Sequence, residues 1–154
     1  MFVFTLSCAT KKDIPKSEPV VELNPKLIFL NYTLTEDANG NKNFAFISKK
    51  FTYGKARNLG NKYINTGSIG DLKCSKLDEN AQNLRSVFIK NPLNKNIEYI
   101  NDSLQFESKS LKLKKTPFSL RLQLHPEAES IVIAEVIDSL QNITPLYITK
   151  LETK

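Results

Sequence analysis

Phe118-Ser119-Leu120-Arg121-Leu122-Gln123-Leu124 alternates apolar and polar residues more regularly than any other stretch of the chain. Successive side chains of a β-strand point to opposite faces, so the alternation predicts a strand with its apolar face in a core and its polar face in solvent. His125-Pro126-Glu127 follows and predicts a turn. Beyond it, the β-branched run Ile131–Ile137 is typical of a buried strand. These elements place the fold in the β class.

Strands of the same kind are expected along most of the remaining chain. Leu27–Leu34 alternates, and Asn39-Gly40 after it is a pair that forms tight hairpin turns because it tolerates positive φ. Asp78–Leu84 is polar and compatible with one helical turn, while Pro117 is expected to end the strand before it. The other expected strands contain Phe44–Ile47, Phe51–Tyr53, Asp71–Leu77, Val87–Ile89, Ile97–Tyr99, Leu104–Phe106, Ser110–Lys115 and Leu146–Leu151. About seven to nine short strands without helical periodicity predict one domain over residues 26–154, an all-β antiparallel β-sandwich.

The N-terminus is an apolar run, Met1-Phe-Val-Phe-Thr-Leu6, followed by Ser7-Cys8. It is too short for a membrane-spanning helix, which needs about 20 apolar residues. An apolar stretch that stops at a small residue is typical of the end of a secretory signal. Residues 9–25 hold three prolines, mixed charge and few apolar residues, so an extended linker is expected before the domain. A second interpretation stays open, in which Met1–Leu6 is an edge strand of the core and Cys8 a buried thiol.

Thr5-Leu6-Ser7-Cys8 resembles the lipobox of bacterial lipoproteins. The resemblance implies that residues 1–8 are the end of a truncated signal and that Cys8 carries a lipid anchor. It also implies a place in the cell envelope, at the outer membrane, on its periplasmic or surface face. Each buried CH₂ group of an acyl chain contributes about 0.8 kcal/mol to membrane binding, so the two or three chains of the lipoprotein family hold a protein firmly.

The stretch Val87–Ile137 resembles the Ig-like and fibronectin-type domains of envelope proteins. In those domains a strand ends at an Asn-Pro pair such as Asn91-Pro92, and a later alternating strand such as 118–124 runs into a proline turn. The resemblance implies that the sandwich is Ig-like. The Cys…Trp…Cys core of true immunoglobulin domains is missing, because the chain has no tryptophan.

The formal net charge is +6 and the pI is about 9.3, a basic balance that allows acidic partners such as nucleic acid. The lysines are scattered, however, and they outnumber the arginines, which are preferred for contacts to phosphates and bases. Solvated faces therefore explain the charge better, and no nucleic-acid partner is expected. The two cysteines lack the spacing of a zinc site. Cys74 is expected to point into the core, and a Cys8–Cys74 disulfide is the open alternative.

The sequence offers no complete catalytic set. His125 is the only histidine, and it lies in a turn beside a proline. The nucleophile and phosphate-loop patterns of hydrolases and nucleotide-binding proteins are missing. Glu135, the one acidic residue within an apolar strand, is expected to face solvent. Asp37–Ser48 lacks the glycine and the final acid of a calcium loop. We therefore expect a protein that is not an enzyme and holds neither metal nor cofactor.

Three sets of residues are candidates for function. The long loop 54–70 contains four of the five glycines, and such loops often bind ligands. Its candidate binding residues are Tyr53, Lys55, Arg57 and Tyr63. Ser103 and Ser139 each lie in an Asp-Ser-Leu tripeptide that is similar to the O-glycosylation acceptor of exported bacterial proteins. Cys8 is the expected lipid attachment site.

The function expected from these features is that of a non-catalytic, lipid-anchored envelope protein. It would contact the membrane through its anchor and act through protein–protein or surface contacts with an envelope partner that the sequence does not identify. A small-ligand or glycan-binding module that uses the loop 54–70 is the first alternative. A basic protein of the cytosol that binds nucleic acid is the second.

Overall fold

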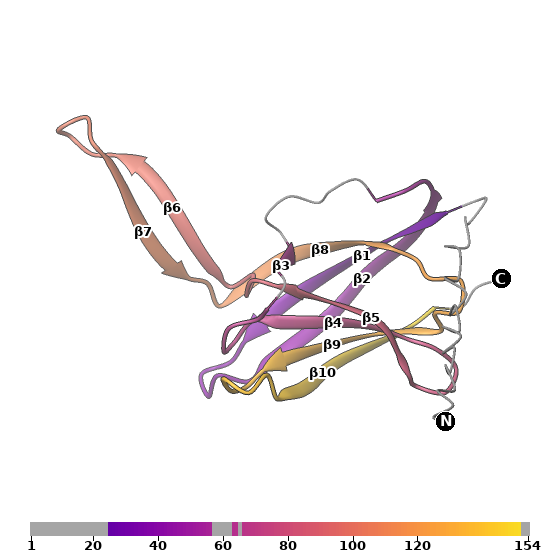
Figure 1. The fold of residues 1–154 in the computed structure, drawn as a ribbon. Coiled ribbons are helices and arrows are strands. Elements are labelled where there is room, and N and C mark those ends of the chain that lie inside the picture. Colours follow the sequence, from indigo (N-terminus) through magenta and orange to yellow (C-terminus); the bar gives the residue numbers. More distant parts are fainter. Residues whose placement is uncertain (1–24, 57–62, 65, 152–154) are drawn as a thin grey trace, which may run out of the picture.

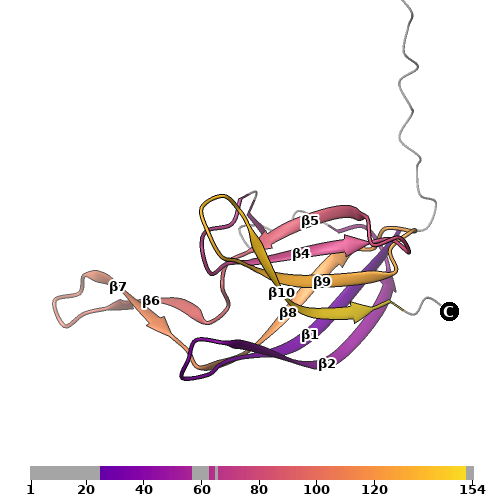
Figure 2. The same ribbon diagram turned by 90° about the horizontal axis from the view of Figure 1, so that it is seen from below.

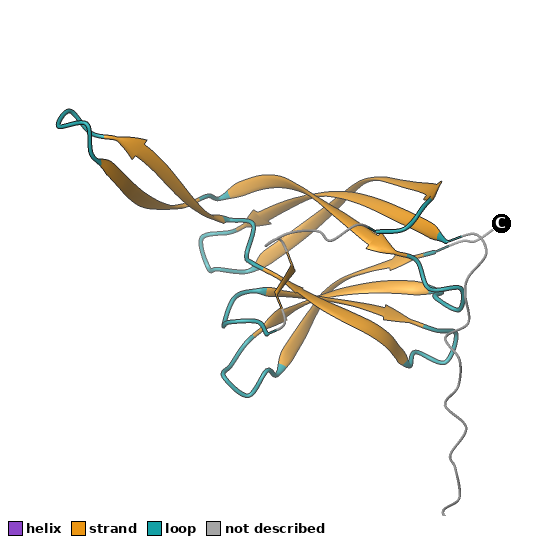
Figure 3. Ribbon diagram, turned by 45° about the horizontal axis from the view of Figure 1, so that its top comes forward, coloured by secondary structure: helices purple, strands orange, loops and turns teal. Residues whose placement is uncertain are grey.

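The computed structural model describes residues 25–56, 63–64 and 66–151. The expected signal, and the linker up to residue 24, lie outside them. In the described part of the chain every regular element is a strand (Figure 3), which confirms the expected all-β class. The strands are β1 (Lys26–Glu36), β2 (Lys42–Tyr53), β3 (Tyr63–Ile64), β4 (Leu72–Leu77), β5 (Asn83–Ile89), β6 (Asn94–Ile100), β7 (Phe106–Lys112), β8 (Lys115–Gln123), β9 (Ser130–Val136) and β10 (Ile143–Lys150).

Two sheets pack face to face as a sandwich (Figures 1 and 2). The smaller sheet has the strand order β2-β1-β8, and the larger sheet has the order β10-β9-β4-β5-β3. All the strand pairs in both sheets are antiparallel. A third, two-stranded sheet of β6 and β7 stands apart from the sandwich. The antiparallel β-sandwich predicted from the sequence is therefore confirmed.

The core is built from the inward faces of both sheets. The alternation of residues 118–124 places Leu120 and Leu122 inside, as expected, while β1 contributes the longest buried row. The core side chains include Ile28, Leu30, Tyr32, Leu34, Leu72, Cys74, Leu120, Leu122, Ile131 and Ile133. Tyr32 joins the two sheets, because its hydroxyl is hydrogen-bonded to Thr149 Oγ1 of β10 at 2.6 Å. Burial raises the pKa of Tyr32 to about 12, so this hydroxyl stays protonated.

The order of the strands can be compared with the Ig-type order. In the larger sheet, the neighbours β10, β9 and β4 stand where an Ig-type sheet has its last, second-last and third strands. In the Ig-type sheet that contains the first two strands, the first strand lies at the edge and the second lies inside. Here β1 is central and β2 is at the edge. Compared with the Ig-type order, the first two strands have therefore exchanged places within the smaller sheet.

Three local expectations were wrong. Pro117 lies inside β8, opposite Thr33, because β8 is an edge strand and a proline there removes no hydrogen bond from the ladder. The expected strands 44–47 and 51–53 are one strand, β2, which carries a bulge opposite Asn31 and Tyr32. The polar segment after Leu77 forms a hairpin turn, and β5 begins at Asn83.

A candidate contact surface on a projecting arm

Strands β6 and β7 form a hairpin, residues 94–112, that projects from one end of the sandwich (Figure 1). We call this hairpin the arm. Every residue of its two strands is exposed. Isolated two-stranded hairpins are at best marginally stable in water, since they have no third strand or packed face. Two features of the arm therefore need an explanation: how it is held, and what its exposed side chains do.

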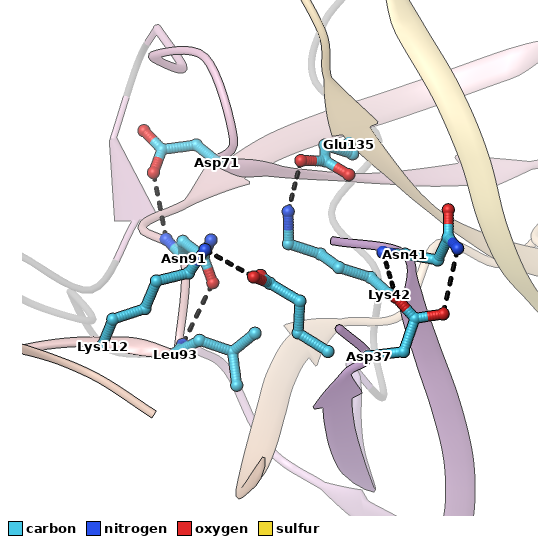
Figure 4. A network of polar contacts seen from close by, with 9 residues as sticks. Asp37, Asn41, Lys42, Asp71, Asn91, Leu93, Lys112 and Glu135 are labelled. Carbon is cyan, nitrogen blue, oxygen red and sulfur yellow. Dashed lines mark hydrogen bonds and ion pairs between the residues drawn. The ribbon is translucent and has the colours of Figure 1, made fainter. Parts of the chain in front are cut away.

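The arm is held at its root by the core and by polar contacts (Figure 4). Leu93, just before β6, is fully buried, and its carbonyl accepts a hydrogen bond from the N–H of Leu113 at 2.8 Å. The N–H of Asn91 donates to Asp71 Oδ1 at 3.0 Å, and Asn91 Oδ1 accepts from the N–H of Leu93 at 3.0 Å. Because both chain segments are fixed where they leave the sandwich, the hairpin starts from a defined direction.

A further contact ties the arm to β1. Lys112, the last residue of β7, forms an ion pair with Glu36, whose side chain is only 12% exposed. The N–H of Glu36 also donates to the carbonyl of Lys114 at 2.9 Å. The end of β1 and the root of the arm are therefore adjacent. Since β1 has 11 residues, its first residue, Lys26, is about 33 Å from Glu36 at about 3.3 Å per residue.

The tip of the arm is apolar. Ile100 and Phe106 are directly opposed in the ladder, and Leu104 lies in the turn between them. Leu104 is 84% exposed and Phe106 82% exposed. We call Ile100, Leu104 and Phe106 the apolar tip. Monomeric soluble proteins rarely expose large apolar side chains side by side, and such groups usually mark a contact site.

One face of the arm is also partly apolar. Directly opposed residues of an antiparallel pair share a face. The pairs Lys95–Leu111, Ile97–Lys109 and Tyr99–Glu107 lie on this face, and the Tyr99 hydroxyl donates to Glu107 Oε2 at 2.7 Å. The opposite face, apart from the tip, carries polar pairs such as Asn96 with Ser110. Four more exposed apolar residues lie at the same end of the sandwich: Ile69, Ile137, Leu140 and Ile143.

The turn at the tip uses a device that recurs in three other hairpins. In each, an Asp or Asn occupies the first turn position, and its side chain accepts hydrogen bonds from the backbone N–H groups of the third and fifth residues of the turn. The fourth residue of each turn has a positive φ. This combination is a type I turn followed by a left-handed residue. The first positions are Asp37, Asp78, Asn101 and Asp138. In the tip, Leu104 takes the left-handed position with a φ of 58°.

Both candidate glycosylation serines lie in such turns. Ser103 follows Asn101 in the tip of the arm, and Ser139 follows Asp138 between β9 and β10. Both serines are exposed. The carboxylate of Asp138 accepts hydrogen bonds from the side chain and the backbone of Asn142, and these lower its pKa. Modification at either serine stays a prediction.

The candidate binding residues of the loop 54–70 are spread over the sandwich. Tyr53 is 74% exposed, pairs with Lys26, and has the Lys26 Nζ 5.9 Å from its ring centroid. Lys55 is exposed at the same end. The backbone of Tyr63 pairs instead with Ile89, near the root of the arm. Arg57 and the side chain of Tyr63 lie outside the described residues, as does Cys8, so these remain predictions.

The expectation that Glu135 faces solvent was wrong. It lies near the end of β9, on the inward face of the strand. There it forms an ion pair with Lys42 of β2, and the Lys42 side chain is 5% exposed (Figure 4). The alternation of β9 puts Ile131, Ile133 and Glu135 on the same inward face. A charged residue can take the last inward position of a strand because a lysine from the other sheet reaches it there. The pair closes the sandwich on the side of the arm.

Three side chains with reactive groups are engaged in packing or in hydrogen bonds. Cys74 is 1% exposed, as expected for an inward residue, and burial raises its pKa to about 12. Lys76, two residues on, donates from Nζ to the carbonyl of Gln123 at 2.8 Å, and burial lowers its pKa. His125 Nδ1 accepts the backbone N–H of Glu127 at 3.4 Å within its own turn.

The described residues hold neither a metal-type cluster nor a membrane-spanning helix. They contain no cluster of three or more side chains of the metal-binding types. No helix within the described ranges is long and apolar enough to cross a membrane. In the comparisons with known proteins, no family model, no curated protein and no solved structure matched this chain.

Proposed function

We propose that this protein is a non-catalytic, lipid-anchored protein of the bacterial cell envelope, and that it acts through protein–protein contacts made by its arm. The observation that carries the proposal is the arm itself. It presents the apolar tip and a half-apolar face to solvent on a root that the core fixes. Protein interfaces are enriched in aromatic residues with a polar rim, and the arm combines Tyr99 and Phe106 with Lys95, Glu107 and Lys109 in this way.

The position of the arm supports the same proposal. The start of β1, at Lys26, and the arm lie at opposite ends of the sandwich (Figure 1). A lipid on Cys8 would be joined to the sandwich at the end that carries Lys26. The arm would then lie at the end farther from the point of attachment, where other envelope proteins can reach it.

The reactive groups support a non-catalytic role. A nucleophilic cysteine needs a lowered pKa and access to substrate, whereas Cys74 is buried and its pKa is raised to about 12. His125, the only histidine of the chain, accepts a backbone hydrogen bond within its own turn. The buried, protonated thiol of Cys74 is therefore not in the state that nucleophilic catalysis requires.

The anchor is tested by the mass of the N-terminal peptide of the protein expressed from its native gene. A diacylglyceryl or triacylglyceryl cysteine at position 8 is expected, and the variant Cys8→Ser should leave the membrane fraction. An unprocessed Met1 together with an unmodified Cys8 would contradict the anchor.

The role of the arm is tested by a tip variant, Ile100→Ser with Leu104→Asn and Phe106→Ser. A matched control changes three exposed apolar residues elsewhere, Ile47→Ser, Tyr53→Ser and Ile148→Ser. After crosslinking in cells, the tip variant should lose the proteins that copurify with the wild type, and the control should keep them. Equal losses from both variants would contradict a contact through the arm.

A further inference from the structure

The arm leaves two strand edges open. It is a two-stranded sheet, so within the described residues the outer edges of β6 and β7 pair with no further strand. An open edge presents backbone N–H and C=O groups in the geometry that another strand needs. We propose that the arm pairs with the arm of a second copy of this chain, β6 beside β6, antiparallel about a two-fold axis at Ile97. This rests on the proposed function, because it names the partner of the same arm.

The register follows from symmetry. An antiparallel pair about a two-fold axis places each residue opposite the one that lies equally far on the other side of the axis. The seven residues of β6 overlap completely when the axis passes through Ile97. Ile97 then meets Ile97, Lys95 meets Tyr99, and Asn96 meets Glu98. No two like charges are opposed, and the two charged residues meet side chains that can contact or hydrogen-bond them.

The same operation on β7 is unfavourable. Its seven residues overlap completely when the axis passes through Lys109. Two ammonium groups would then be directly opposed, which destabilises an antiparallel pair. The charge pattern of the arm therefore selects the β6 edge.

The resulting four-stranded sheet has complementary rows. Tyr99 is opposed to Glu107 in its own arm and bonded to it, so Lys95 of one copy lies beside Tyr99 of the other, with Glu107 one strand beyond. A lysine beside a tyrosine ring gains from the attraction between the cation and the ring. The two Ile97 side chains, each 48% exposed in the single chain, meet at the axis. The third and fourth strands also supply what an isolated hairpin lacks.

The association closes at two copies. A two-fold interface uses the same surface on both partners and leaves no β6 edge free for a third. The outer edges of the four-stranded sheet are then the two β7 strands, which carry Lys109 and Lys112. Lysines on an edge strand oppose further pairing.

The test is sedimentation equilibrium of the 154-residue chain with Cys8→Ser, so that no lipid drives association. A dimer is expected. Ile97→Lys and Ile97→Glu each place like charges at the axis and should weaken the dimer about tenfold. An equimolar mixture of the two variants should recover the wild-type affinity, and Ile148→Lys on β10 should leave it unchanged. Thermal melts check that each variant folds. A monomeric chain, or a mixture no tighter than its components, would overturn the self-pairing.

A photoreactive amino acid in place of Tyr99 separates this inference from the proposed function. In cells, an adduct of twice the mass of the chain supports the self-pairing. An adduct with a different protein, together with a monomeric purified chain, overturns the self-pairing and leaves the proposed function standing. The absence of any adduct counts against both.

Discussion

The contact between Tyr32 and Thr149 gives a quantitative test of how the two sheets pack. The Tyr32 side chain is fully buried, Thr149 is 8% exposed, and their hydroxyls are 2.6 Å apart. Tyr32→Phe keeps the ring, whose centroid lies 5.6 Å from that of Phe118 and 6.0 Å from that of Phe44. The variant therefore removes only the hydroxyl, and it leaves the hydroxyl of Thr149 buried without its partner. We expect the free energy of unfolding to fall by about 1–2 kcal/mol.

Urea denaturation of four proteins measures this effect: the wild type, Tyr32→Phe, Thr149→Val and the double variant. Because both polar partners are replaced in the double variant, its loss should be smaller than the sum of the two single losses, with a coupling energy of about 1 kcal/mol. Tyr99→Phe is the control, since its hydroxyl bonds to Glu107 on the exposed arm. If Tyr32→Phe costs no more than Tyr99→Phe, or if the single losses simply add, the sheets do not pack in the described register.

Three further predictions concern single residues. Ala81 has a φ of 60° and occupies the turn position that Gly40 takes in the hairpin of β1 and β2. In urea denaturation, Ala81→Gly should therefore raise the free energy of unfolding by about 0.5–1 kcal/mol, and Gly40→Ala should lower it. Lys76→Met should raise stability at pH 7 by about 1 kcal/mol, because burial disfavours the ammonium. Because the pKa of Lys76 is lowered in the folded state, the unfolded chain binds more protons between that lowered pKa and about 10.4. The stability of the wild type should therefore rise with pH in that window. An equal rise in the Lys76→Met variant would contradict the role of Lys76. Cys74, with its pKa raised to about 12, should react with a thiol reagent at pH 8 only as fast as the chain unfolds.

The fold class could be predicted because the local signals agree. The alternation in β8, the β-branched run in β9 and the Asn39-Gly40 turn each point to antiparallel strands, and each forms as expected. The place of Pro117 could not be predicted, because only the strand order shows that β8 is an edge. The inward position of Glu135 follows from the period of β9, but its partner Lys42 is far away in the sequence.

The arm was visible in the sequence only as two strands. Alternation identifies a strand, but it does not say whether another layer covers that strand. In the arm, Asn94, Asn96, Ser108 and Ser110 make one face polar, while Ile97, Tyr99 and Leu111 give the other only a partial apolar stripe. One face of these two strands is polar, and the other combines apolar residues with lysines. That combination is the sequence signal that could have predicted a hairpin without a covering layer. The predicted loop site rested on the length and composition of segment 54–70, and neither of these by itself brings side chains together.

The central claim is that the arm makes the contacts of an anchored protein. We would test it by placing a photoreactive amino acid in the full-length chain in living cells, at Phe106 in the tip and, separately, at Tyr53 near the opposite end; both side chains are highly exposed. The account predicts strong, discrete crosslinks from position 106 and few from position 53. Equal crosslinking from both positions, or none from position 106, would contradict it.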